Sequence, residues 1–314
     1  HAPRNSVRVG FTSACNMQLN IIGHSKLWLA ISGTILATSM ICVAVFGLNE
    51  GIDFTGGSLL SIHAPEGVTQ EQVRATVEHA GFPPTVQTAS DGSMLVRVSP
   101  LTEAEHQSIL TALRTDFGDV TEQEFNSVGP TIGNELRKQA IIAIGLVLLL
   151  IAAYIAWAFR RVAEPVASWK YGLITLIAAA HDVVIPLGVF AVLGKFFGFE
   201  ADTAFVAALL TILGYSINDT IVVFDRTREN LYRHRHDDTT FAATVNASIM
   251  ETLARSLNTT LCVLLPVLAI VIFGGESTRS FSVTLLVGIL AGAYSSIFVA
   301  SPLLVMSEFW GKKK

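Results

Sequence analysis

The residues with the clearest chemical potential are three ionisable side chains in long apolar segments: Asp182, Asp219 and Arg255. A charged side chain in the hydrocarbon of a bilayer costs at least about 2.5–3.5 kcal/mol, so such a residue usually serves a function. Two acids and one base on separate segments predict a proton path, or a salt bridge that opens and closes. His181, beside Asp182, suits a proton shuttle as well as a packing and hydrogen-bonding role.

Asp219 and Arg255 are the residues that we expect to pair. Asp219 precedes Asp225, near which its apolar segment ends, and lies about 9 Å inside that end at the rise of an α-helix. Arg255 lies at a similar depth in the next segment, so the two side chains can meet across a helix interface. Polar residues at helical spacing flank Asp219, and such a stripe should face protein or water. Four polar residues are expected to support the proton-coupling residues Asp182, Asp219 and Arg255, namely Tyr215, Asn218, His181 and Asn258.

The composition is that of a membrane protein. Of 314 residues, 51% are hydrophobic and only 15% are charged, whereas soluble domains carry about 25% charged residues. A helix needs about 20 apolar residues to cross the bilayer core, and six segments meet this requirement. They lie near residues 27–48, 139–158, 170–193, 203–224, 252–273 and 281–306.

Basic residues gather on one side of these segments, which sets their orientation. They occur in the arm at 1–26, in the loops after the second and fourth segments, and in the tail at 309–314. By the positive-inside rule we expect both termini to be cytoplasmic and the insert at 49–138 to face outward. The arm is not expected to be a signal peptide, because the apolar run that follows it lacks a small-residue cleavage site. Residues 139–308 hold the remaining five helices.

The insert at 49–138 has the pattern of a small α+β domain. It holds 13 acidic and 5 basic residues, the reverse of a cytoplasmic loop. Two stretches begin with capping-box sequences, Thr69 followed by Gln72 and Thr102 followed by Glu105, which predict helix starts. The full prediction is β-α-β-α-β, compatible with a ferredoxin-like domain, with strands at 58–62, 94–98 and 120–128 and helices at 69–80 and 102–117. The scattered histidines predict no metal site, because metal ligands must converge.

Glycine-containing motifs mark the two junctions between the insert and the membrane segments. At the first, Gly56 and Gly57 allow positive φ, and we expect Asp53 to bond local backbone as a turn residue. No GK[ST] sequence follows, so this is not a phosphate-binding loop. The second junction contains Gly129 and Gly133. We expect both motifs to be structural.

Four stretches together resemble the SecF family, the smaller subunits of the SecD–SecF protein-export complex in the resistance–nodulation–division superfamily. The resemblance extends over about residues 20–308 and includes the six-span layout. No single stretch is decisive, but the order of the motifs is specific. The stretches are GIDFTGG at 51–57, VGPTIGNEL at 128–136, ILGYSINDTIVVFDRTREN at 212–230 and ETLARS at 251–256.

The resemblance implies a function without chemical catalysis. Members of this family use the proton gradient to promote preprotein translocation through the SecYEG channel of the bacterial cytoplasmic membrane. The implied partners are SecD, SecYEG and unfolded preprotein segments, which the insert would grip. The intramembrane acid and base of the family correspond to Asp219 and Arg255. The proton is the coupling ion and no cofactor is implied. A modest basic patch at 233–236 is expected to contact lipid headgroups or partner loops rather than nucleic acid.

Several alternatives stay open at this stage. A proton-coupled exporter of small molecules or lipids belongs to the same superfamily, and a passive translocon scaffold would leave Asp219 and Arg255 as a static ion pair. An intramembrane aspartyl protease fits poorly, because Asp219 lacks a G-x-G-D setting. Asp182 belongs to the proton path or caps a helix disturbed by Pro186. The sequence does not decide between proton and sodium coupling, fusion to SecD, the surface of the insert that contacts substrate, or its conformations.

Overall fold

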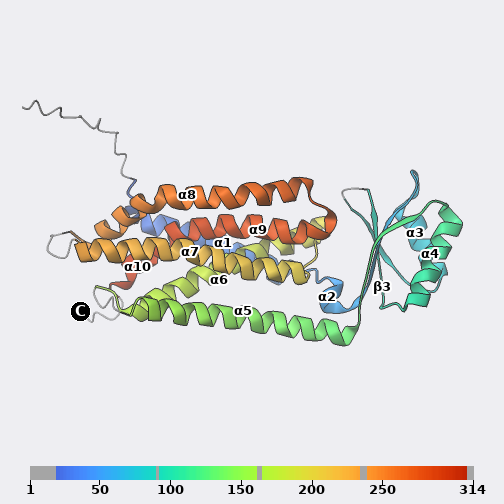
Figure 1. Cartoon of the computed structure of the whole chain (residues 1–314), viewed down its shortest axis with the longest axis horizontal. Helices are drawn as coiled ribbons and strands as arrows, with labels where there is room; N and C mark the ends of the chain where they lie inside the picture. The colour runs from blue at the N-terminus through green and yellow to red at the C-terminus, as the bar shows by residue number, and fades with distance from the viewer. Residues whose placement is uncertain (1–18, 90–91, 161–164, 234–238, 310–314) are drawn as a thin grey trace, which may run out of the picture.

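In a computed structural model the chain is an elongated molecule with a helical bundle at one end and the α+β insert at the other (Figure 1). The structure describes residues 19–89, 92–160, 165–233 and 239–309. Most of the predicted N-terminal arm, nearly all of the 233–236 patch and the 310–314 part of the tail lie outside these ranges.

Within the described ranges, six helices are long and apolar enough to cross a membrane, as the sequence predicts. The last span is one run of three elements, in which a π-helical turn interrupts the α-helix. The spans are α1 (Ser25–Phe46, preceded by the short η1, Ile22–His24), α5 (Pro130–Ala158), α6 (Ser168–Phe197), α7 (Thr203–Arg233), α8 (Phe241–Phe273), and α9 (Glu276–Ser295) with η2 (Ser296–Ala300) and α10 (Ser301–Ser307).

The helices α7 and α8 continue well beyond their predicted limits at the end of the bundle away from the insert. The predicted limits follow hydropathy, but the extensions are polar and hold one another in place. Arg226 pairs with Glu229 at 2.6 Å and also with Glu251 of α8. Asn230 donates to Ser248 across the same interface at 3.0 Å. Polar contacts between neighbouring helices therefore carry both helices past the apolar region.

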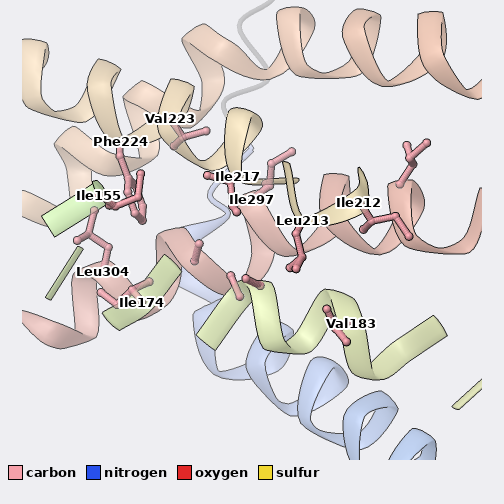
Figure 2. Close-up of a cluster of buried hydrophobic side chains, with 14 of the residues drawn as sticks. Ile155, Ile174, Val183, Ile212, Leu213, Ile217, Val223, Phe224, Ile297 and Leu304 are labelled. Atoms are coloured by element: carbon pink, nitrogen blue, oxygen red, sulfur yellow. The ribbon is translucent and has the colours of Figure 1, made fainter. Parts of the chain in front are cut away.

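Three of the spans form the interior of the bundle. The buried share of the most apolar window is 50% in α6, 50% in α7 and 61% in the last span, but only 11%, 6% and 17% in α1, α5 and α8. Apolar side chains from these central helices pack together, including Ile174, Val183, Ile212, Leu213 and Ile297 (Figure 2). The central position of α6, α7 and α9 decides where the buried polar residues meet.

Small residues allow α7 and α9 to approach closely. A Cβ atom at Gly288 would lie 2.1 Å from Ile212, and one at Gly292 would lie 2.8 Å from Ser216. One turn further, Ser296 and Thr220 bond through their hydroxyls at 2.9 Å. Small residues four apart are typical of helix packing in membranes. This contact fixes the register of α9 against the helix that carries Asp219.

In its described residues the insert contains a four-stranded antiparallel sheet in the order β2-β3-β1-β4, with two helices between the strands in the chain. Its element order is β-α-β-β-α-β, so the ferredoxin-like prediction is confirmed. Both predicted capping boxes form, at Thr69 and at Thr102. The elements are β1 (Gly57–His63), α3 (Gln70–His79), β2 (Thr85–Thr88), β3 (Met94–Val98), α4 (Glu103–Phe117) and β4 (Thr121–Val128).

Two short elements are absent from the sequence prediction. Strand β2 has four residues and follows a pair of prolines. Prolines argue against a strand in the sequence, although they are tolerated at the edge of a sheet. The single-turn helix α2, Ile52–Thr55, lies where a turn is expected. One face of the sheet is covered by α3 and α4, and the other faces the bundle (Figure 1). The insert is tied to the bundle by an ion pair between Arg97 of β3 and Glu200 in the α6–α7 loop.

Candidate functional site

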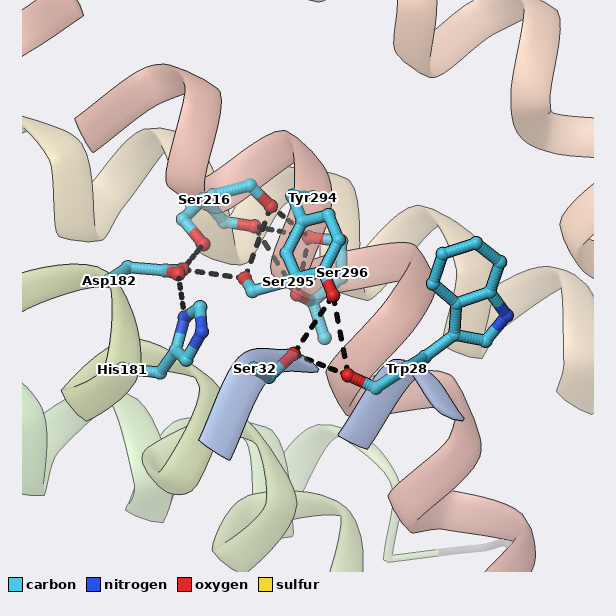
Figure 3. Close-up of polar contacts among 10 residues, drawn as sticks. Trp28, Ser32, His181, Asp182, Ser216, Tyr294, Ser295 and Ser296 are labelled. Carbon is cyan, nitrogen blue, oxygen red and sulfur yellow. Dashed lines mark hydrogen bonds and ion pairs between the residues drawn. The ribbon is translucent and has the colours of Figure 1, made fainter. Parts of the chain in front are cut away.

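Asp182 is the centre of a polar cluster in the middle of the bundle (Figure 3). Its side chain is fully buried. Its Oδ2 accepts hydrogen bonds from the hydroxyl of Ser216 on α7 and from that of Ser295 on α9, the latter at 2.8 Å. Its Oδ1 lies 3.0 Å from Nδ1 of the adjacent His181. Both oxygens of this carboxylate therefore have partners, and these come from three helices.

These bonds separate the two roles that the sequence allows for Asp182. A cap on the disturbed turn before Pro186 requires bonds to backbone groups of α6, but the carboxylate bonds side chains of α7 and α9 instead. The hydroxyl of Ser296 extends the cluster, because it donates to the backbone oxygen of Ser216 at 3.3 Å. Asp182 therefore connects the three central helices and does not cap the turn of α6 that Pro186 disturbs.

His181 occupies the boundary between this cluster and a second polar group. Its ring stacks at 6.4 Å from Tyr294, and Ser32 of α1 donates to the Tyr294 hydroxyl at 3.0 Å. Because its Nδ1 faces the carboxylate, its Nε2 is left as a buried atom without a hydrogen-bond partner among the described residues. The imidazole is thus fixed on one side and unsatisfied on the other.

Asp219 is also buried, but it is bonded very differently. It is only 2% exposed, and its Oδ2 has no hydrogen-bond partner in the described part of the chain. It lies near Thr260 of α8 and within electrostatic range of Arg255. Tyr215, one turn earlier on α7, donates to Thr260 at 3.3 Å. Asp219 is a buried acid with unused hydrogen-bonding capacity at the α7–α8 interface.

The predicted direct ion pair between Asp219 and Arg255 is not formed in this structure. Within the described residues, the ion pairs shorter than 4.0 Å do not include Arg255, and its side chain is exposed. Asn218 and Asn258 are exposed as well. The structure therefore brings Tyr215, Thr260 and Asp219 together but leaves three of the predicted residues on the outer surface of α7 and α8.

Asp53 does not bond local backbone, contrary to the sequence prediction. Its Oδ2 accepts hydrogen bonds from the backbone N–H of Thr203 at 2.9 Å and from the Thr203 hydroxyl at 2.6 Å. Thr203 begins α7, so the acid lies at the N-terminal end of that helix. The next acid, Asp202, is partly buried, and this burial raises the pKa of its carboxyl, with a further increase from the charge of Asp53. The sequence contains no local signal for a bond across 150 residues.

The glycines of the two junctions meet one another. Gly56 and Gly57 have positive φ, 74° and 137°. A Cβ at Gly56 would lie 2.8 Å from Cα of Pro130, and one at Gly133 would lie 3.0 Å from the backbone oxygen of Phe54. Gly129 has an ordinary φ and no such crowding. Both predicted motifs thus form a single packed junction of α2 against the start of α5.

Nothing in the described ranges gathers three or more histidine, cysteine or acidic side chains in a way that could hold a metal ion. Among the described residues of the insert, His106 has an acidic neighbour: its Nε2 lies 3.0 Å from Glu122, and its ring stacks on Phe125. This arrangement fastens β4 to α4. The residues that the sequence singles out for proton chemistry, Asp182 and Asp219, are both buried in the bundle instead.

Comparisons with known proteins agree with this arrangement. Residues 108–310 match the model of the family described as protein export membrane protein SecD/SecF, C-terminal, and residues 43–64 match the SecD/SecF GG motif. A protein translocase subunit SecF from Thermobaculum terrenum is 40% identical, over 92% of this chain and 94% of its own length. One from Anaerolinea thermophila is 39% identical with the same coverage.

A solved structure is similar as well. The crystal structure of SecDF, described as a translocon-associated membrane protein from Thermus thermophilus, superposes with a TM-score of 0.80 and 37% identity. The alignment covers 92% of this chain but only 38% of that longer one. The similarity therefore includes the bundle and the insert together.

Proposed function

This chain belongs to the SecD/SecF family of protein-export membrane proteins, and from that premise we propose that it is a SecF-like subunit of the bacterial cytoplasmic membrane. It acts with SecD beside the SecYEG channel and uses the proton gradient to promote preprotein translocation. The names of its relatives, which are translocase subunits, support a role in transport. The relative named SecDF, of which this chain spans 38%, supports a SecD-like partner.

The observation that carries the proposal is the unsatisfied carboxylate of Asp219 beside an exposed polar face. A buried oxygen without a partner is costly, so it is expected where a group must gain and lose a proton. Arg255, Asn218 and Asn258 are exposed within or beside membrane-spanning segments. Polar groups at that depth require protein or water around them rather than lipid. A SecD-like partner would cover this face and complete the site.

The mechanism follows from these positions. Asp219 alternates between ionised and protonated forms, and its ionised form draws in the Arg255 guanidinium, which lies within electrostatic range. Protonation releases Arg255 and allows α7 and α8 to change their relative position. One elementary charge crossing 100 mV supplies about 2.3 kcal/mol, which biases a two-state arrangement of helices appreciably. The insert, facing outward, transmits this change to the exported polypeptide.

Asp182 has a supporting part in this proposal. Its carboxylate is bonded to Ser216 and Ser295, and Ser216 lies one turn before Asp219 on α7. The bonds hold α7 in register with α6 and α9, so that these three helices move together against α8 when Asp219 gains or loses a proton. His181, whose Nδ1 lies against Asp182 and whose Nε2 has no hydrogen-bond partner among the described residues, belongs with Asp182 to the proposed path.

The test is preprotein translocation into inverted membrane vesicles that contain this protein and its SecD partner, with and without a proton gradient. Asp219→Asn should reduce translocation with a gradient to the level without one. Asp225→Asn is the matched control, because Asp225 lies further along the same helix, exposed and paired with Arg228 at 2.5 Å. An assembled Asp219→Asn complex with full stimulation would contradict the proposal. Stimulation that requires sodium instead of a proton gradient would contradict proton coupling.

A further inference from the structure

The junction motif around Asp53 connects the insert to the helix that carries Asp219. Asp53 lies in the short helix α2, directly before β1 of the insert. Its carboxylate bonds both the backbone N–H and the hydroxyl of Thr203, the first residue of α7. We propose that Asp53 is a positioning residue that passes a displacement of α7 to the insert. This inference rests on the proposed function, because it assumes that α7 responds to Asp219.

Main-chain bonds reinforce the contact at the start of α7. The N–H of Gly51 donates to the oxygen of Ala201 at 2.8 Å, and the N–H of Ala201 donates to the oxygen of Asn49 at 2.8 Å. These bonds form a parallel bridge between Glu50 and Ala201. The segment that leads into the insert is thus bonded to the segment that leads into α7. A movement of the outer end of α7 must either carry this segment along or break these bonds.

On its other side, α2 is packed against α5 without free space. Gly56 and Gly133 are the close-contact points, since a Cβ at either would lie within 3.0 Å of the opposing backbone. Glu50 also pairs with Arg137 of α5 at 2.9 Å. The helix α2 therefore lies between α7 and α5 and contacts both. Strand β1, an inner strand of the sheet, begins directly at Gly57, whose φ of 137° suits glycine.

Asp53 has features that a merely space-filling residue would lack. It is partly exposed, so packing alone does not explain an acid at this position. A negative charge at a helix N-terminus is favourable. It is held close to a second acid, Asp202, whose pKa is raised by burial and by the charge of Asp53. The carboxylate therefore stays at the helix start despite a repulsive neighbour, which fits a residue that fastens α7 to α2.

The experiment measures whether the insert still changes its distance from the bundle in response to the proton gradient when the bond between Asp53 and Thr203 is removed. The full chain with its SecD partner is reconstituted in proteoliposomes after Cys15, Cys42 and Cys262 are replaced by serine. Spin labels on the exposed positions Thr111 in α4 and Lys195 in α6 then report the distance between the insert and the bundle. The distance distribution is recorded by pulsed electron paramagnetic resonance with and without a proton gradient. Translocation is measured in parallel for each variant.

We expect the gradient to shift the distance distribution in the parent and not in Asp53→Ala, with gradient-stimulated translocation reduced at least tenfold. Asp53→Asn keeps an acceptor oxygen and should retain part of both responses. Thr203→Ser should respond like the parent, whereas Thr203→Val, which lacks the hydroxyl, should be intermediate. The matched control is Asp119→Ala, an exposed acid of the insert between α4 and β4.

The outcomes distinguish this inference from the proposed function. If the parent responds to the gradient and Asp53→Ala responds equally, the inference is wrong while the proposed function stands. If the parent does not respond and Asp219→Asn changes nothing, the proposed function fails first. If Asp53→Ala does not accumulate, the comparison of Asp53→Asn with Thr203→Val decides, because equal and undiminished responses in both would overturn the role of this bond.

Discussion

Asp182 and Asp219 lie in the same helical bundle, are almost completely buried, and are bonded in opposite ways. Asp182 has partners on both carboxylate oxygens, from α6, α7 and α9. Asp219 has an oxygen without a partner and lies near an exposed basic residue on α8. Burial of an acid in the bundle is therefore not enough to identify it as a proton-coupling group. A satisfied acid holds helices together, whereas an unsatisfied one still has a bond to gain.

The difference between Asp182 and Asp219 is tested by measuring the stability of each variant and its coupling to the proton gradient separately. For each variant, the free energy of unfolding is obtained by denaturant titration of the purified protein in detergent micelles. Gradient-dependent translocation is obtained in vesicles with the SecD partner. Residues of the Asp182 cluster should affect mainly the first quantity, and residues around Asp219 mainly the second.

Truncation of Asp182 should have the largest effect on stability. Asp182→Ala leaves the donors of His181, Ser216 and Ser295 buried without their acceptor, which should lower the free energy of unfolding by about 3–5 kcal/mol. Asp219→Ala is the matched truncation on α7 and should cost less than half as much, because it removes fewer bonds. Equal losses for the two variants would remove the distinction between the acids.

Filling the α7–α9 contact should have the next largest effect. Gly292→Ala places a Cβ 2.8 Å from that of Ser216, and overpacking of this kind costs about 1–3 kcal/mol. Gly214→Ala on α7 is the control, since nothing lies within 4 Å of its new Cβ. Alanine in a helix is favoured over glycine by up to about 1 kcal/mol, so this control should be neutral or stabilising. A stable Gly292→Ala protein would show that the interface can separate without loss.

Removal of one hydroxyl from the cluster should have a smaller effect. Ser295→Ala deletes one of the donors to Asp182 and should lower the free energy of unfolding by about 1 kcal/mol. Gradient-dependent translocation should stay close to that of the parent. Ser280→Ala on the same helix is the control for loss of a serine hydroxyl, because its bond is to the backbone of Glu200 outside the cluster. A complete loss of coupling in Ser295→Ala with normal stability would place Asp182 at the centre of the proton path.

Replacement of Arg255 should have the smallest effect on stability. Its side chain is exposed, so Arg255→Ala should change the free energy of unfolding by no more than about 0.5 kcal/mol. Gradient-dependent stimulation should nevertheless fall to the level without a gradient, and Arg255→Lys should restore part of it. Normal stimulation in an assembled Arg255→Ala complex would show that Asp219 acts without this partner.

In the insert, some elements follow from local sequence patterns and one strand does not. Both capping boxes and three of the four strands follow from local patterns, because a cap bonds residues three apart and a strand shows its alternation within a few residues. Strand β2 does not follow from the sequence, because a strand of four residues at a sheet edge, after two prolines, has almost no pattern of its own. Its place is set by pairing with β3 rather than by its own residues.

The six spans, the α+β insert and the acids at membrane depth can be predicted from the sequence, because hydropathy and capping depend on residues close together in the chain. Which of the two acids has its hydrogen bonds satisfied depends on how the helices pack. The two serine partners of Asp182 lie 34 and 113 residues away, and the partner of Asp53 lies 150 residues away. Such bonds depend on the register in which helices pack, and that register is set by contacts such as Gly292 against Ser216. No local pattern in the sequence contains this information.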